Sequence, residues 1–237
     1  MEVFEKIDVE PMFNRTKLLL GEQNLQKIRH ANICICGVGG VGSYVLEAIC
    51  RMGVESITVI DKDKVDASNI NRQLVASWCT VGMEKAEVAK VHIETISPKT
   101  KVNAIVDYID VANVEKYITG DFDYVIDAID SIASKIAIIK RCKELNIPVI
   151  SSMGMANKLD PLKIKVADIS KTTVCPLARI IRKRLKELNI KDVKVVYSEE
   201  EPIKNESNIL GSVPFVPSVG GLVIASEVVK DIINNND

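Results

Sequence analysis

A glycine-rich loop between an apolar strand and an amphipathic helix limits the folds open to this chain. Residues 32–36 form an apolar run, residues 41–51 have helical spacing, and a second apolar run covers residues 56–60. The loop that joins the first run to the helix contains Gly37, Gly39, Gly40 and Gly42. Glycines here allow a tight turn and close approach of the backbone to a ligand, while the helix N-terminus offers free N–H groups to phosphate. The pattern predicts a Rossmann-like unit that binds a nucleotide.

Strands and helices continue to alternate as far as residue 154. Apolar runs at 102–108, 123–128 and 148–151 predict strands, and amphipathic patterns at 84–96, 111–118 and 132–145 predict helices. Near-continuous apolar strands between amphipathic helices are typical of a parallel sheet with both faces covered. We therefore predict an α/β fold with a mostly parallel sheet and helices on both faces.

The pattern changes after residue 154. Residues 162–166 and 193–197 predict strands around a basic helix at 176–188, and breaker residues cluster between 199 and 217. We expect an antiparallel extension that carries a loop over the site, followed by a C-terminal helix. The prediction is one domain over residues 1–237, with a nucleotide-binding half at 1–154 and a substrate-side extension at 155–237.

Composition and charge exclude several classes of protein. The chain has 237 residues, of which 47% are hydrophobic and 27% charged, and this composition suits a globular protein with a real core. A net charge of −1 does not favour nucleic acid or an anionic membrane, so any nucleic-acid contact must come from a local patch. The acidic N-terminus lacks an apolar run, and the apolar stretch at 219–229 is too short to span a bilayer. We expect a cytoplasmic protein with no membrane contact.

Charged residues after the strands indicate which nucleotide is bound. Asp61 ends the second strand, where an acidic residue would hold a ribose, and Arg72 and Lys85 follow it. A hydride-transferring enzyme has no need of these cations, whereas a triphosphate with a departing pyrophosphate does. Asp130 follows a later strand and is our candidate ligand for Mg²⁺. The set favours ATP and adenylation of a carboxylate over a nicotinamide reaction.

The six cysteines include no Cys-x-x-Cys pair, so we expect no zinc site and reduced, mostly structural thiols. Cys175 precedes Pro176 at the start of the basic helix, where a thiol pKa can be lowered. We favour a capping role for it over a catalytic one. For Trp78 we favour anchoring in the core over stacking on a base.

These motifs resemble the ubiquitin-activating-enzyme-like superfamily, whose bacterial members include MoeB and ThiF. The matching stretch runs from Arg15 to about Gly154 and includes the glycine loop and the SNINRQ, GMEKA and DAID segments. The resemblance implies catalytic roles for Arg15, Arg72, Lys85 and Asp130, with Asp130 on the metal and Arg15 entering from the neighbouring subunit of a homodimer. Besides the loop glycines, it implies nucleotide contacts by Asp61, Asp63, Ser68, Asn69, Arg72, Gln73, Lys85 and Ser131.

The second half of the chain narrows the resemblance. Segments 151–154, 158–161, 166–172 and 195–200 resemble the tRNA threonylcarbamoyladenosine dehydratase family. This implies ATP-dependent cyclisation of threonylcarbamoyladenosine beside the tRNA anticodon, through adenylation of its carboxylate. It also suggests a cysteine desulfurase as a candidate sulfur-relay partner and leaves a monovalent cation open. The alternative is an adenylyltransferase that activates the C-terminal Gly-Gly of a small ubiquitin-like sulfur carrier.

Departures from the related patterns bear on this choice. MoeB-like enzymes carry a zinc-binding Cys-x-x-Cys pair, and its absence favours the tRNA enzyme. Residues 201–217 lack the cysteine that some dehydratases have there, and Cys175 stands where the family usually has an acidic residue. For tRNA contact the densest basic run is the candidate, although a solvated helix face is the alternative: Arg179, Arg182, Lys183 and Arg184.

Overall fold

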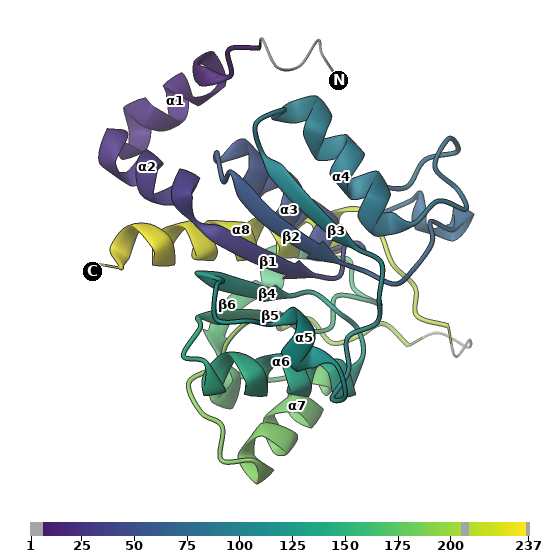
Figure 1. Cartoon of the computed structure of the whole chain (residues 1–237). Coiled ribbons are helices and arrows are strands. Elements are labelled where there is room, and N and C mark those ends of the chain that lie inside the picture. The colour runs from purple at the N-terminus through teal and green to yellow at the C-terminus, as the bar shows by residue number, and fades with distance from the viewer. Residues whose placement is uncertain (1–6, 205–208, 236–237) are drawn as a thin grey trace.

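The computed structural model describes residues 7–204 and 209–235 of the chain and centres on a seven-stranded sheet of order β3-β2-β1-β4-β5-β7-β6 (Figure 1). The strands are β1 (Asn32–Cys36), β2 (Ser56–Ile60), β3 (Lys101–Ile105), β4 (Tyr124–Asp127), β5 (Val149–Ser152), β6 (Ile164–Asp168) and β7 (Lys194–Ser198). Every neighbouring pair is parallel except β6 and β7. The predicted mostly parallel sheet is confirmed, and the antiparallel extension is confined to the edge strand β6, because β7 continues the sheet parallel to β5.

The helices follow the strands largely as predicted. They are α1 (Glu10–Leu20), α2 (Glu22–His30), α3 (Gly42–Arg51), α4 (Lys85–Ile96), α5 (Val114–Tyr117), α6 (Ile132–Glu144), α7 (Pro176–Glu187) and α8 (Phe215–Asn234). Helix α5 is shorter than the 111–118 pattern suggested, and α1 and α2 were not among the predicted elements. None of the helices in the described ranges is long and apolar enough to span a membrane.

Helices cover both faces of the sheet (Figure 1), and alternate residues of β1 pack into two different apolar clusters. Ile33 and Ile35 pack in one cluster with residues of α3, α4 and α8, including Ile49. Cys34 and Cys36 point to the other face, in a cluster with residues of α6. A fully buried aliphatic side chain contributes about 1.5–3 kcal/mol, so both faces of this central strand stabilise the fold. Helices on both faces are therefore confirmed.

Helix α8 brings the C-terminal part of the chain against the glycine loop. A Cβ on Gly221 would lie 2.4 Å from the carbonyl oxygen of Val41, so only glycine allows this approach to α3. Further along α8, Lys194 Nζ donates to Asp231 Oδ1 at 2.6 Å, which ties the helix to β7. The core therefore continues without a break across residue 154.

Candidate functional site

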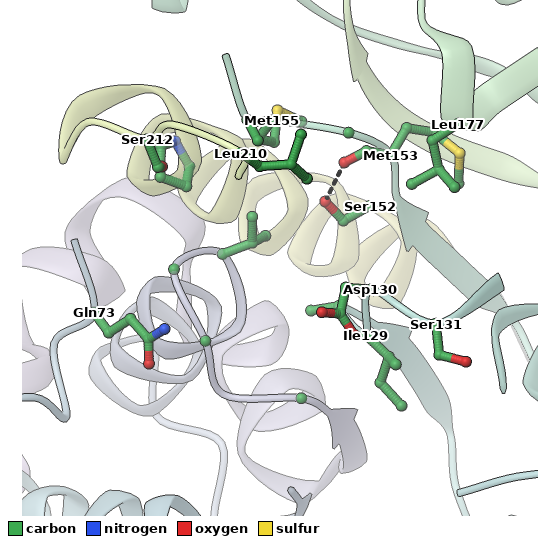
Figure 2. A pocket seen from close by; sticks show the side chains of 18 of the residues that line it. Gln73, Ile129, Asp130, Ser131, Ser152, Met153, Met155, Leu177, Leu210 and Ser212 are labelled. Carbon is green, nitrogen blue, oxygen red and sulfur yellow. Dashed lines mark hydrogen bonds between the residues drawn. The ribbon is translucent and has the colours of Figure 1, made fainter. Parts of the chain in front are cut away.

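A cavity of about 840 Å³ opens where the parallel strands end (Figure 2). Ile60 and Ser152 line it at the ends of β2 and β5, and Gly37 and Ala128 line it directly after β1 and β4. Ligands of doubly wound sheets bind at this edge, and the volume suits a nucleotide together with a second group. Residues from both halves of the chain contribute to this one space.

The loop glycines differ in what a side chain would meet at each position. Gly37 has a φ of +87°, and an added Cβ would lie 2.9 Å from the carbonyl oxygen of Ala128. A Cβ on Gly42 would lie 1.8 Å from the carbonyl oxygen of Gly37. The fold itself thus requires both. A Cβ on Gly39 would meet only the side-chain nitrogen of Gln73, at 3.8 Å, so the bare backbone there leaves room on the cavity side.

Asp61 joins the end of β2 to the glycine loop. Its Oδ2 accepts a hydrogen bond from the N–H of Val38 at 2.8 Å, and its Oδ1 accepts one from the N–H of Asp63 at 2.9 Å. Burial raises the pKa of the Asp61 carboxyl, although these two hydrogen bonds lower it in part. A partly buried carboxylate on the cavity wall can accept hydrogen bonds from a pair of ligand hydroxyls.

A local chain pairing brings Lys85 to the same wall. Lys64 and Glu84 form an antiparallel bridge, and the N–H of Lys85 donates to the carbonyl oxygen of Asp63 at 2.9 Å. The side chain of Lys85 is buried, and its Nζ lies 3.1 Å from Asp63 Oδ2. Lys85 therefore offers a cation to the cavity from the first residue of α4.

The segment after the short helix η1 (Ala67–Asn69) carries a cation and an amide to the loop. Arg72 Nη1 donates to the carbonyl oxygen of Ser68 and to Asn71 Oδ1, both at 2.8 Å, which holds the guanidinium at the cavity. Gln73 is only 7% exposed, and its Oε1 has no hydrogen-bond partner within the described residues. An unpaired buried amide oxygen costs about 1–3 kcal/mol, which a donor on a ligand would offset.

Asp130 and Ser131 line the cavity just before α6, and Figure 2 shows Asp130 across the cavity from Gln73. Asp130 is exposed and makes no ion pair or hydrogen bond within residues 7–204 and 209–235. Asp127, at the end of β4, is instead fully buried and accepts a hydrogen bond from Lys135 Nζ at 3.1 Å. Of the two carboxylates in the DAID segment, only Asp130 can meet a ligand.

The described ranges hold no group of three or more His, Cys, Asp or Glu side chains that could bind a metal ion. A cation beside Asp130 would therefore take most of its ligands from phosphate and water. Mg²⁺ commonly binds in this way, so the residues present fit it.

Some predicted residues lie outside the cavity. Arg15 is exposed on α1, and Ser68 is exposed on η1, where its carbonyl rather than its hydroxyl holds Arg72. Arg182 differs from its basic neighbours on α7, because its Nη1 donates to the carbonyl oxygen and hydroxyl of Thr172 at 2.7 and 2.6 Å. The solvent-facing basic residues of α7 are thus Arg179, Lys183, Arg184 and Lys186.

The expectations for the cysteines and for Trp78 are met only in part by the structure. Cys34, Cys36, Cys50 and Cys142 are buried and free, and burial raises the pKa of Cys50 to about 11, so these thiols suit structural roles. Cys175 is the N-cap residue of α7, without a side-chain cap hydrogen bond, and it lines the cavity. The expectation that Trp78 anchors in the core is wrong, because its side chain is 79% exposed.

Sequence reasoning missed several cavity residues. Tyr108 follows β3, and its hydroxyl lies 3.1 Å from Ser131 Oγ; the apolar run hid it, because the strand ends at Ile105 and not at residue 108. Figure 2 shows others after β5 and in the C-terminal half. The missed set includes Tyr108, Ser152, Met153, Met155, Lys158, Leu177, Leu210, Ser212 and Pro217.

Comparisons with known proteins agree with this geometry. A model of the ThiF family matches residues 13–237. The chain is 39% identical to the tRNA threonylcarbamoyladenosine dehydratase of Bacillus subtilis, over 94% of this chain and 95% of that protein. It is 42% identical to the Escherichia coli dehydratase, over 73% of this chain and 65% of that protein.

Among solved structures, that of E. coli tRNA N6-threonylcarbamoyladenosine dehydratase, TcdA, in complex with ATP has a TM-score of 0.89 and 37% identity, and the match covers 94% of each chain. More distant relatives include the adenylyltransferase and sulfurtransferase UBA4 of Lodderomyces elongisporus, 34% identical over 57% of this chain and 30% of that protein.

Proposed function

We propose a function for this chain, which belongs to the ThiF family: it is an ATP-dependent tRNA threonylcarbamoyladenosine dehydratase. The main observation behind this proposal is that the glycine loop and the segment after β5 line the same cavity. A nucleotide on the loop and a modified base against that segment would share this space. Full-length similarity to curated dehydratases supports the choice of substrate.

The first chemical step is adenylation. A carboxylate oxygen of the threonylcarbamoyl group attacks the α-phosphorus of ATP, and the bond to pyrophosphate breaks. Lys85 and Arg72 are the fixed cations that would stabilise the charge on the phosphates, and the loop N–H groups would orient them. Asp130 would hold Mg²⁺, which supplies further neutralisation of phosphate charge when bound.

The second step closes the ring. A nucleophile within the same modified base attacks the acyl carbon, and AMP leaves with one oxygen of the original carboxylate, so the nucleoside loses the elements of water. The reaction needs orientation and charge stabilisation rather than a side-chain nucleophile. Met153, Met155, Leu177 and Leu210 offer an apolar surface for a base at this end of the cavity.

Asp61 and Gln73 are proposed to bind the nucleoside part. Asp61 would accept the ribose hydroxyls, and a donor on the nucleotide would satisfy Gln73 Oε1. Gly39 leaves space for the phosphates, and Ser131, Asp63 and Asn69 complete the wall. Residues 1–237 would act as one domain, because α8 from the C-terminal half packs against the glycine loop. Its Pro217 Cβ lies 3.3 Å from where a Cβ on Gly40 would be.

A homodimer is part of the proposal. Helix α1 exposes Leu18 and Leu19, at 87% and 82%, beside the exposed Arg15. Neighbouring exposed leucines support burial against a second copy, which would carry Arg15 to the partner's triphosphate. Equilibrium ultracentrifugation of the wild type and a Leu18→Asp, Leu19→Asp variant tests this, with a monomeric wild type as the contrary result. A cytoplasmic location is proposed from the sequence pattern, and a cysteine-desulfurase partner from the resemblance alone.

The decisive experiment is mass spectrometry of nucleosides from tRNA incubated with the pure protein and ATP. Threonylcarbamoyladenosine should lose the mass of water, with AMP and pyrophosphate released in equal amounts. A parallel incubation should contain a small carrier protein ending in Gly-Gly. Adenylation of that carrier with no change in tRNA would favour the alternative activity instead.

A further inference from the structure

Lys158 is a buried lysine whose ammonium group has no anionic partner among residues 7–204 and 209–235. Its side chain is 3% exposed, and its Nζ donates to the carbonyl oxygen of Ser198 at 3.0 Å. Within the described residues no carboxylate lies within ion-pair distance of it. The carboxylate of Glu200 accepts instead from the N–H groups of Leu159 and Asp160, at 2.9–3.1 Å. Burial lowers the pKa of Lys158, while Cys175 and Glu200 oppose this shift.

Lys158 lies where a ligand in the cavity could supply the missing anion. Lys158 lines the same cavity as the glycine loop, at the end formed by the segment after β5 and by Cys175 at the start of α7. An ammonium group has three N–H donors, and the structure uses one of them on Ser198. Leaving a buried cation unpaired is unfavourable, so a ligand that brings an anion to this end would be stabilised.

We propose that Lys158 receives the carboxylate of the threonylcarbamoyl group and thereby distinguishes modified from unmodified tRNA. This inference rests on the proposed function. The carboxylate has two oxygens, so one can accept from Lys158 while the other attacks the α-phosphorus and displaces pyrophosphate. Neutral adenine, which lacks the carboxylate, would bring no anion to Lys158.

The same chemistry predicts where the contact acts along the reaction. The carboxylate loses its charge when it becomes the acyl adenylate, so the attraction to Lys158 is strongest in the bound substrate. Removing Lys158 should therefore raise the KM for modified tRNA by about ten- to hundredfold, the scale of a hydrogen bond to a charged group, and change kcat less. A general disturbance of the fold would not separate the two constants in this way.

The test uses three anticodon stem-loops that carry threonylcarbamoyladenosine, its methyl ester, or plain adenosine. Their affinities are measured with a non-hydrolysable ATP analogue present, for the wild type, Lys158→Met and Lys158→Gln. Lys163→Met is the matched control, because Lys163 is exposed and does not line the cavity. The wild type and Lys163→Met should prefer the acid over the ester by about tenfold or more.

In Lys158→Met the acid and the ester should bind equally, with the affinity for Mg·ATP unchanged. Lys158→Gln keeps a donor for Ser198 and should lose the preference while remaining folded. A wild type that binds acid and ester equally, or variants that keep the preference, would overturn the role of Lys158. If the wild type does not convert threonylcarbamoyladenosine at all, the proposed function fails instead, so the two failures are distinguishable.

Discussion

The ammonium group of Lys85 lies 3.1 Å from the carboxylate of Asp63, but the two side chains differ in environment. Lys85 is buried on the cavity wall, whereas Asp63 is about half exposed. Asp63 therefore holds the lysine side chain in place on the cavity wall. A triphosphate would share this cation with Asp63 and would bring far more negative charge to it.

Replacing Lys85 with alanine should weaken Mg·ATP binding by about ten- to hundredfold, because a buried hydrogen-bonding cation is lost. Isothermal titration calorimetry measures the change. Lys140→Ala is the control, since Lys140 lies exposed on α6, pairs with Glu144 and does not line the cavity. Equal ATP affinity in Lys85→Ala and the wild type would contradict a phosphate contact by this lysine.

Asp130 and Asp127 should respond differently to the same substitution. Asp130→Asn should reduce the gain in ATP affinity on adding Mg²⁺, with affinity in EDTA nearly unchanged, because only the metal contact is lost. Asp127→Asn breaks a buried ion pair with Lys135 and should lower the free energy of unfolding by about 3–5 kcal/mol. Calorimetry and urea denaturation measure the two effects. If Asp130→Asn gained as much ATP affinity from Mg²⁺ as the wild type does, Asp130 would not be a ligand of the metal.

Two glycines of the loop should also separate an effect on ATP binding from an effect on stability. Gly39→Ala should fold with a wild-type unfolding midpoint, since a Cβ there has room, yet it should bind ATP more weakly because the methyl group occupies the phosphate side. Gly42→Ala should destabilise the protein severely, because its Cβ would overlap the carbonyl oxygen of Gly37. Thermal denaturation and calorimetry on both variants check this pair. Wild-type ATP affinity in Gly39→Ala would contradict phosphate binding at that point of the loop.

The features that sequence predicted best depend on local pattern. The strand before Gly37 and the helix after it follow from apolar periodicity, and Asp61 and Asp130 reach the cavity because each follows a parallel strand. Parallel strands end at one edge, so sequence position is enough to place such residues there.

The missed features depend on packing between distant segments. Lys158 enters the cavity through the course of the chain after β5, and Pro217 does so through the close approach of α8 to α3. Helix α1 lacks a broad apolar stripe for the main core; its buried Phe13 belongs to a small cluster with Val9 and Leu25. Trp78 shows the opposite error, since aromatic character alone did not place it inside.

The pKa of Asp61 predicts how nucleotide affinity depends on pH. Burial raises this pKa above the ordinary Asp value of about 3.9, so the native state binds the proton more tightly than the unfolded chain. Ionised Asp61 therefore costs folding free energy above its folded-state pKa, and this cost declines as the pH falls from that pKa to the lower pKa of the unfolded chain. A ribose hydroxyl that donates to the carboxylate favours the ionised form.

ATP affinity should accordingly fall as pH is lowered, starting at a higher pH than an ordinary Asp would give. Calorimetry between about pH 7 and pH 4.5 should show this for the wild type. Asp61→Asn should bind ATP weakly and should lack the part of the pH dependence that comes from Asp61. The phosphates of ATP titrate identically in both experiments. Parallel pH profiles for the two proteins would refute the role of Asp61.

Helix α7 should bind tRNA through only part of its basic run. Arg179, Lys183 and Arg184 face solvent, so replacing all three with Glu should weaken tRNA binding and lower the slope of log affinity against log salt by about 0.7–0.9 per lost phosphate contact. ATP affinity should not change, since none of the three lines the cavity. Arg182→Glu should behave differently. Its guanidinium holds Thr172, so the substitution should lower the unfolding midpoint. Filter binding over a salt series, with thermal denaturation of each variant, measures both effects. An unchanged salt slope in the folded triple variant would show that α7 is an ordinary solvated face and that tRNA binds elsewhere.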